Sequence, residues 1–101
     1  MTPIIWSPES VRDLESIRRY IAADSPVYAD LMVRRIVAGV ERLRTFPRSG
    51  RIVPERDVPH IREVIVGAYR VVYRLRNDLV EIVTVFRSSR LLPDSIRVMR
   101  A

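Results

Sequence analysis

The hydrophobic residues of this chain change their spacing near residue 60, and this change constrains the fold more than any other feature of the sequence. Before it, apolar residues recur every three to four positions, which is the period of an amphipathic helix. After it, apolar and polar residues alternate, which is typical of strands with one buried face. Helices followed by a run of strands indicate an α+β fold, in which the helices pack on an antiparallel sheet.

Two helices are predicted in the first half of the chain, and both begin with the same signal. Ser7 and Ser25 suit the N-cap position, and each is followed by a proline at the first helical position. The second helix should end near Phe46-Pro47, because a residue before proline disfavours helical geometry. Only residues 23–25 separate the two helices, so they should pack as an antiparallel hairpin. The apolar stripes are Val11, Leu14, Ile17 and Ile21, then Met32, Val33, Ile36, Val37, Val40 and Leu43.

The strands predicted from the sequence are a short one at residues 3–6 and a meander in the second half. Its strands are residues 61–66, 69–76 and 79–86, joined by tight turns at Gly67-Ala68 and Asn77-Asp78. A short helix is expected after Pro93, and the whole chain, residues 1–101, is expected to be one domain.

Two-residue turns fix the register of such a meander. Tyr73 should then face Ile82, and Tyr69 should face Phe86 on the side that receives the helices. The other side should be partly polar and open. Its expected residues are Glu63, Arg70, Val72, Arg74, Glu81, Val83 and Val85.

Arginine supplies every basic side chain, because the 18 basic residues include no lysine, and the net charge is +6. Such a charge favours an anionic partner, which is nucleic acid, the ribosome or an acidic protein. Biased codon usage alone is the other explanation. The chain has one histidine, no cysteine and three widely spaced glycines, so no metal, cofactor or phosphate-binding loop is expected. We expect a cytoplasmic protein, since no apolar run is long enough to span a membrane and the first residues do not resemble a signal peptide.

Acid–base cleavage of RNA is the chemistry that these residue types fit best. It needs a base for the 2′-hydroxyl, an acid for the leaving oxygen and cations at the phosphate. Glu55, His60 and Glu63 are candidates for the first two roles. The candidate cations are Arg51, Arg62, Arg70, Arg87 and Arg90. Simpler interpretations stay open: the loop residues are solvated, and Arg70 forms a surface ion pair with Glu63.

A serine–histidine–aspartate triad can also be written, from Ser49, His60 and Asp57. Their spacing gives it no support, because triads are defined by geometry that a sequence does not supply.

Four stretches resemble, in the same order, toxins of the RelE/ParE superfamily and are most similar to its ParE-like branch. They are Trp6-Ser7-Pro8-Glu9 with the helix through Ala22, Pro47–Arg51 followed by Pro54-Glu55, Ile61–Tyr73, and Ile82–Arg90 followed by Pro93. The resemblance implies the toxin of a bacterial type II toxin–antitoxin system. It also implies a cognate antitoxin protein that binds the toxin in a hetero-oligomer and holds it inactive.

The resemblance implies two different targets, because RelE-like toxins cut mRNA on the ribosome and ParE-like toxins inhibit DNA gyrase. RelE-like chains carry lysines where this chain has Ile61 and Glu63, and a tyrosine near the C-terminus, whereas this chain has no tyrosine after Tyr73. Arg70 and Arg90 match the family pattern, but Arg87 stands where many ParE-like chains have histidine.

These matches and departures favour a gyrase inhibitor that is not an enzyme, with Arg70, Arg87 and Arg90 as target-binding residues. Two alternatives stay open. One is a ribosome-dependent mRNA endoribonuclease that uses Glu55, Arg70 and Arg90 for catalysis. The other is a basic binding module without toxicity.

Overall fold

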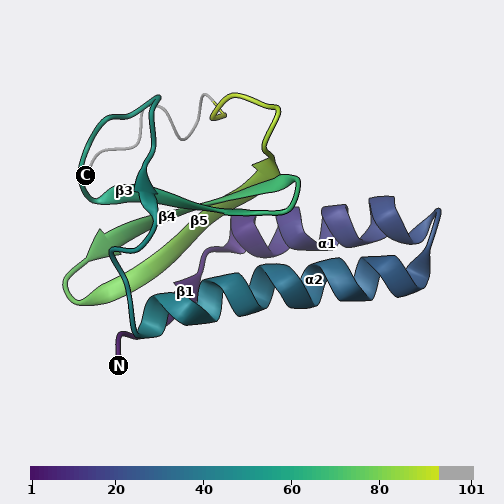
Figure 1. Cartoon of the computed structure of the whole chain (residues 1–101), viewed down its shortest axis with the longest axis horizontal. Coiled ribbons are helices and arrows are strands. Elements are labelled where there is room, and N and C mark those ends of the chain that lie inside the picture. Colours follow the sequence, from purple (N-terminus) through teal and green to yellow (C-terminus); the bar gives the residue numbers. More distant parts are fainter. Residues whose placement is uncertain (94–101) are drawn as a thin grey trace.

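A computed structural model of the protein describes residues 1–93, in which two helices pack against a five-stranded sheet (Figure 1). The α+β order predicted from the hydrophobic spacing is confirmed, whereas the predicted C-terminal helix lies outside the described residues. The elements are β1 (Ile4–Trp6), α1 (Pro8–Ala22), α2 (Pro26–Glu41), the 3₁₀ turn η1 (Arg42–Arg44), β2 (Arg51–Ile52), β3 (Ile61–Val66), β4 (Tyr69–Arg76) and β5 (Leu79–Arg87).

Both helices begin where the serine–proline signals predict. The Ser7 hydroxyl accepts a hydrogen bond from the Ser10 amide at 3.0 Å, and the Ser25 hydroxyl accepts one from the Tyr28 amide at 3.2 Å. Ser7 also donates its hydroxyl proton to the Val83 carbonyl at 2.9 Å, so the same residue starts α1 and ties it to β5. The two helices run side by side as the expected antiparallel hairpin (Figure 1).

The sheet has the strand order β1-β5-β4-β3-β2. The meander β3-β4-β5 is antiparallel as predicted, and β1 pairs in parallel with β5 at its edge. The sequence did not predict β2, because two residues between breakers carry no period that could be recognised.

The predicted register is correct at one end of the β4–β5 pair and wrong at the other. Tyr73 faces Ile82 as expected, but Tyr69 faces Arg87, and Phe86 faces Arg70. The cause is a β-bulge next to Val72 and Tyr73, which places one extra residue in β5. Beyond the bulge the side chains of β5 change sides, so Val85 joins the helix-facing core and Phe86 leaves it.

The expectation that the second face of the sheet is open is also wrong. A second apolar cluster covers it, built from Val53, Ile61, Val72, Val83, Phe86 and Leu92. The loop between β2 and β3 and the segment after β5 bring Val53 and Leu92 to this face. Arg70 and Glu63 are therefore buried beneath these two segments, at 5% and 1% exposure. Neither described helix is long and apolar enough to cross a membrane.

Candidate functional site

Arg70 lies at the centre of a buried polar network on the second face of the sheet. Its Nε donates to Glu63 Oε1 at 2.7 Å, and its Nη1 and Nη2 donate to the two carboxylate oxygens of Glu55 at 3.0 and 2.8 Å. Nη1 also donates to the carbonyl of Arg90 at 3.0 Å, and the guanidinium lies 4.9 Å from the centre of the Phe86 ring. All three nitrogens are thus occupied, and the simple surface pair with Glu63 is replaced by a buried network.

Glu55 reaches this network from the loop between β2 and β3. Its Oε2 accepts a hydrogen bond from the Leu92 amide at 2.9 Å, in addition to the paired contact with Arg70. These hydrogen bonds, with Arg70 first among them, lower the pKa of the Glu55 carboxyl from 4.5 to about 2. Glu55 is therefore an ionised structural partner and not a solvated loop residue.

Glu63 balances two arginines from inside the sheet. Its side chain is fully buried and accepts from Arg70 through one oxygen and from Arg51 Nε through the other. Arg51 lies opposite Glu63 in the β2–β3 pair, so this ion pair joins the two strands. Arg62 is held differently, by the carbonyls of Arg48, Gly50 and Pro59.

The structure does not assemble the serine–histidine–aspartate triad. His60 lines a hollow with Arg48 and Arg76, whereas Ser49 lines a separate groove beside α2. The His60 Nε2 atom is buried and has no hydrogen-bond partner within residues 1–93. Neither Ser49 nor Asp57 reaches it.

The other predicted target-binding residues are both exposed: Arg87 is the last residue of β5, and Arg90 lies on the turn that follows it. The turn is held by hydrogen bonds from the Ser88 amide to the Ala68 carbonyl and from the Arg90 amide to the Arg87 carbonyl, at 2.7 and 3.0 Å. Leu91, which the sequence did not single out, is 70% exposed beside Arg90. The structure therefore separates the three predicted arginines, with Arg70 buried and the other two displayed. We define residues Arg87–Leu91 as the display turn.

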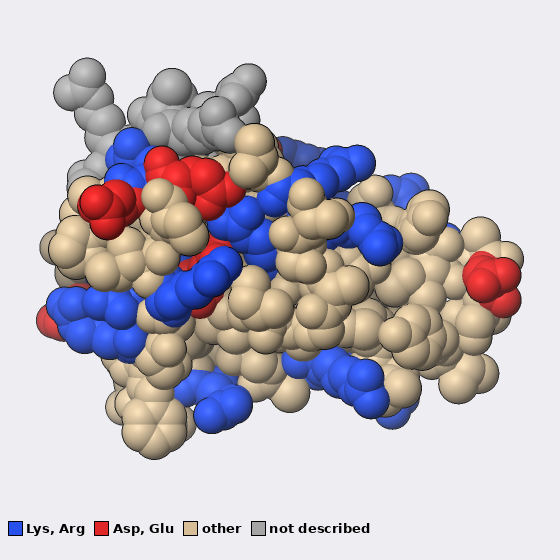
Figure 2. Space-filling view, turned by 45° about the horizontal axis from the view of Figure 1, so that its top comes forward, with Lys and Arg blue, Asp and Glu red and all other residues tan. Residues whose placement is uncertain are grey.

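A groove of about 680 Å³ runs between α2 and the edge of β3. Arg35 of α2 and Arg42 of η1 rim it, and neither forms a salt bridge within the described part of the chain. Gly39 keeps α2 close to the sheet here, because an added Cβ would lie 2.9 Å from Val66 Cγ2. Figure 2 shows arginine side chains spread over the visible face, whereas acidic side chains are confined to a few places. We call the groove lined by Arg35, Gly39, Arg42 and residues 63–67 the α2–β3 groove.

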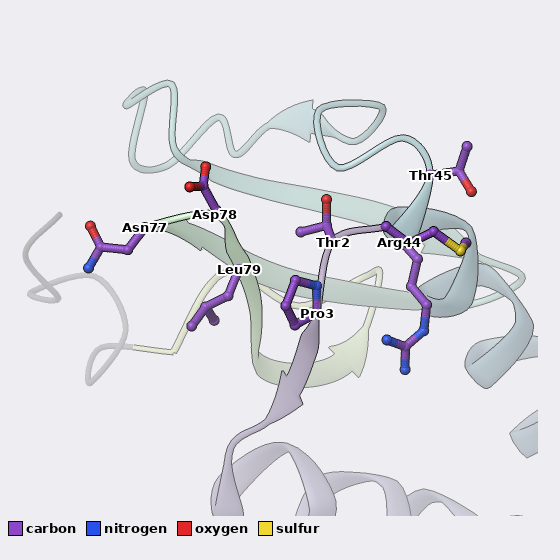
Figure 3. Close-up of a pocket in the computed structure, with 8 residues that line it drawn as sticks. Thr2, Pro3, Arg44, Thr45, Asn77, Asp78 and Leu79 are labelled. Carbon is purple, nitrogen blue, oxygen red and sulfur yellow. The ribbon is translucent and has the colours of Figure 1, made fainter.

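Two further features carry no evident chemistry. A hollow of about 790 Å³ lies near the N-terminus, between Thr2, Pro3 and the β4–β5 turn (Figure 3). Its arginine, Arg44, is already paired with Glu41. Among residues 1–93, no group of three histidine, aspartate or glutamate side chains is arranged to hold a metal ion.

Two contacts that fix the site were missed by the sequence reasoning. Asp13 in α1 accepts hydrogen bonds from the Thr84 hydroxyl at 2.6 Å and the Val85 amide at 3.0 Å, just beyond the bulge in β5. Leu92 anchors the end of the display turn at 2% exposure. Asp13 could have been found from the sequence, because it is a polar residue on the side of the helix that faces the core. Leu92 could not, because it lies outside any stretch with a helical or strand period.

Comparison with known proteins identifies the family of this chain and a solved structure with the same fold. A family model described as "ParE toxin of type II toxin-antitoxin system, parDE" matches residues 4–92. "Toxin RelE2" of Caulobacter vibrioides is 32% identical over 92 residues, which cover 90% of this chain and 100% of that protein. "Putative toxin Y4kP" of Sinorhizobium fredii is 36% identical over 92 residues, covering 89% and 92%.

A solved structure, "Chromosomal ParDE TA system from P. aeruginosa", superposes with a TM-score of 0.71 at 23% identity, over 86% of this chain and 96% of that one. That likeness supports the fold, and the family model and the relatives confirm the resemblance seen in the four sequence stretches. The chain belongs to the ParE toxin family of type II toxin–antitoxin systems.

Proposed function

We propose that this toxin acts in the bacterial cytoplasm by binding DNA gyrase, that it cleaves no RNA, and that a cognate antitoxin neutralises it in a hetero-oligomer. The observation that carries this proposal is the occupied Arg70–Glu55 pair. An RNA-cleaving site needs a free cation at the phosphate and a base whose pKa is near the working pH. Arg70 has no free nitrogen, and the pKa of Glu55 is about 2.

The remaining candidates for catalysis do not gather around a common point. Glu63 is buried and held by two arginines, and His60 lies in a different hollow. Exposed arginines at the display turn remain available for binding an acidic surface, which suits an inhibitor. The ParE-like branch, to which the resemblance is greatest, implies gyrase as that target.

The antitoxin is proposed to place an acidic segment in the α2–β3 groove. The rim arginines Arg35 and Arg42 supply the complementary charge, and a chain that orders on binding can follow such a groove. A segment that neutralises both arginines would also raise the association rate at low salt.

Purified toxin added to gyrase in a DNA supercoiling assay, and in parallel to ribosomes translating a defined mRNA, tests the target. We expect inhibited supercoiling and uncut mRNA. The name of the relative "Toxin RelE2" makes the second reaction a necessary control. Codon-specific cuts in the mRNA with unaffected gyrase would contradict the proposal. If neither reaction is affected and induced cells grow normally, the chain is a basic binding module.

A further inference from the structure

The display turn presents two cations and one large apolar side chain to solvent. Arg87, Arg90 and Leu91 are exposed, and neither arginine forms a salt bridge within residues 1–93. Arginine is among the residues enriched at the energetic centres of protein interfaces, and a partner that covers the turn would also remove the exposed Leu91 side chain from water.

The backbone on both sides of Leu91 is held by the buried network. Arg70 Nη1 donates to the carbonyl of Arg90 at 3.0 Å, and the amide of Leu92 donates to Glu55 Oε2 at 2.9 Å. The Leu92 side chain is packed in the second apolar cluster. Leu91 is therefore held outward by its anchored neighbours.

Arg70 itself is not a contact residue. It is 5% exposed, and its nitrogens are all occupied by Glu55, Glu63 and the Arg90 carbonyl. Its charge is compensated inside the protein, so it offers nothing to an outside partner.

We propose that the display turn is the surface with which the toxin contacts its target, and that Glu55 and Arg70 are positioning residues that act through it. The partner surface is a protein with an apolar recess for Leu91, flanked by carboxylates for Arg87 and Arg90. This inference rests on the proposed function only in treating the toxin as an inhibitor that binds its target. It does not depend on the target being gyrase.

The test is a double-mutant cycle scored by growth arrest in induced cells, as the toxin level that halves the growth rate. Leu91→Ala and Arg90→Ala should each raise this level about tenfold, as truncation of a central contact does. Leu31→Ala and Arg19→Ala are matched controls on the exposed surface of the helix hairpin and should leave the level unchanged. Thermal melting checks the fold of every variant.

The second arm concerns Glu55. Glu55→Ala removes the acceptor of the Leu92 amide and one carboxylate partner of Arg70, so it should reduce toxicity about tenfold. Glu55→Gln keeps an acceptor for the Leu92 amide and should restore toxicity. Combining Glu55→Ala with Leu91→Ala should add little to either single change, because both act on one contact. Amide exchange at Leu92 should be faster in Glu55→Ala and near wild type in Glu55→Gln.

Several outcomes would overturn the inference. Full toxicity of both Leu91→Ala and Arg90→Ala would show that the turn is not the contact surface. Multiplicative effects of Glu55→Ala and Leu91→Ala would show that Glu55 does not act through the turn. If Glu55→Ala fails to fold, the toxicity of Leu91→Ala, Arg90→Ala and Glu55→Gln decides whether the inference holds. Growth arrest with unaffected gyrase would contradict the proposed target and leave this inference intact.

Discussion

Tyr73 shows at the scale of one residue how a strand side chain organises a distant loop. It is fully buried, donates its hydroxyl proton to the Pro47 carbonyl at 2.8 Å and accepts from the Gly50 amide at 3.0 Å. Burial raises the pKa of the hydroxyl, so it stays protonated and able to donate. Gly50 fits only without a side chain, since a Cβ would lie 2.6 Å from the Glu63 carbonyl and from the Tyr73 hydroxyl.

Tyr73→Phe should therefore destabilise the protein by about 1–3 kcal/mol, because it leaves the buried Gly50 amide without an acceptor. Urea denaturation measures this free energy of unfolding. Tyr20→Phe is the matched control, since Tyr20 is 74% exposed and its change should be close to neutral. Equal stability of the two variants would show that the Tyr73 hydroxyl does not hold the loop.

The lowered pKa of Glu55 predicts that the free energy of unfolding depends on pH. Its folded pKa, about 2, is below the ordinary value of 4.5, so its ionised form stabilises the fold above pH 4.5. That contribution, about 2–3 kcal/mol, should be lost as the pH falls from 4.5 towards 2. Wild type and Glu55→Gln should therefore differ in unfolding free energy at pH 7 and converge near pH 2. Glu15→Gln, on the exposed surface of α1, controls for the loss of charge, and a constant difference between wild type and Glu55→Gln across this range would refute the assignment.

At the scale of elements, α1 is joined to β5 at the point where the bulge disturbs the strand. Asp13 accepts from the Val85 amide and the Thr84 hydroxyl, so it satisfies a backbone donor that β1 is too short to reach. Asp13→Ala should cost about 1–3 kcal/mol, with faster amide exchange at Val85. Asp24→Ala, in the exposed turn between the helices, should be nearly neutral. Normal protection of Val85 in Asp13→Ala would exclude this role.

Much of the element plan could be predicted from the sequence, because caps, prolines and the hydrophobic period are local signals. The exchange of Val85 and Phe86 could not, since a bulge within an apolar run leaves no mark in the pattern. Glu55 was singled out as a candidate base or a solvated loop residue, and its hydrogen bonds to Arg70 and Leu92 were not predicted. Its partners, Arg70 and Leu92, lie 15 and 37 residues away in the chain, and no local pattern joins them.

At the scale of the whole molecule, some arginines are paired with carboxylates, whereas others are exposed and form no salt bridge within residues 1–93. Arg51, Arg70 and Arg74 are paired with carboxylates. Arg35 and Arg42 rim the α2–β3 groove, and Arg87 and Arg90 lie on the display turn. Exposed arginines are therefore presented to partners at two separate surfaces, the α2–β3 groove and the display turn.

The two arginines at the rim of the α2–β3 groove are the ones that we expect the antitoxin to bind. Replacing both Arg35 and Arg42 by glutamate should weaken the complex at least tenfold, because like charges then face an acidic segment. Arg12→Glu with Arg19→Glu, on α1, has the same change of charge outside the groove and should have a smaller effect. Calorimetric titration with the product of the neighbouring reading frame, at low and high salt, measures this. Equal losses in the two double variants would contradict the placement of the antitoxin.

The central claim is that Glu55 holds structure and does no chemistry, so the most direct test is growth arrest by the Glu55→Gln variant. The variant is induced in cells, its fold is checked by circular dichroism, and mRNA integrity and the DNA damage response are scored together. We expect a folded toxin that still arrests growth, with intact mRNA and an induced damage response. A folded but harmless Glu55→Gln variant, beside a wild type that cuts mRNA, would contradict it.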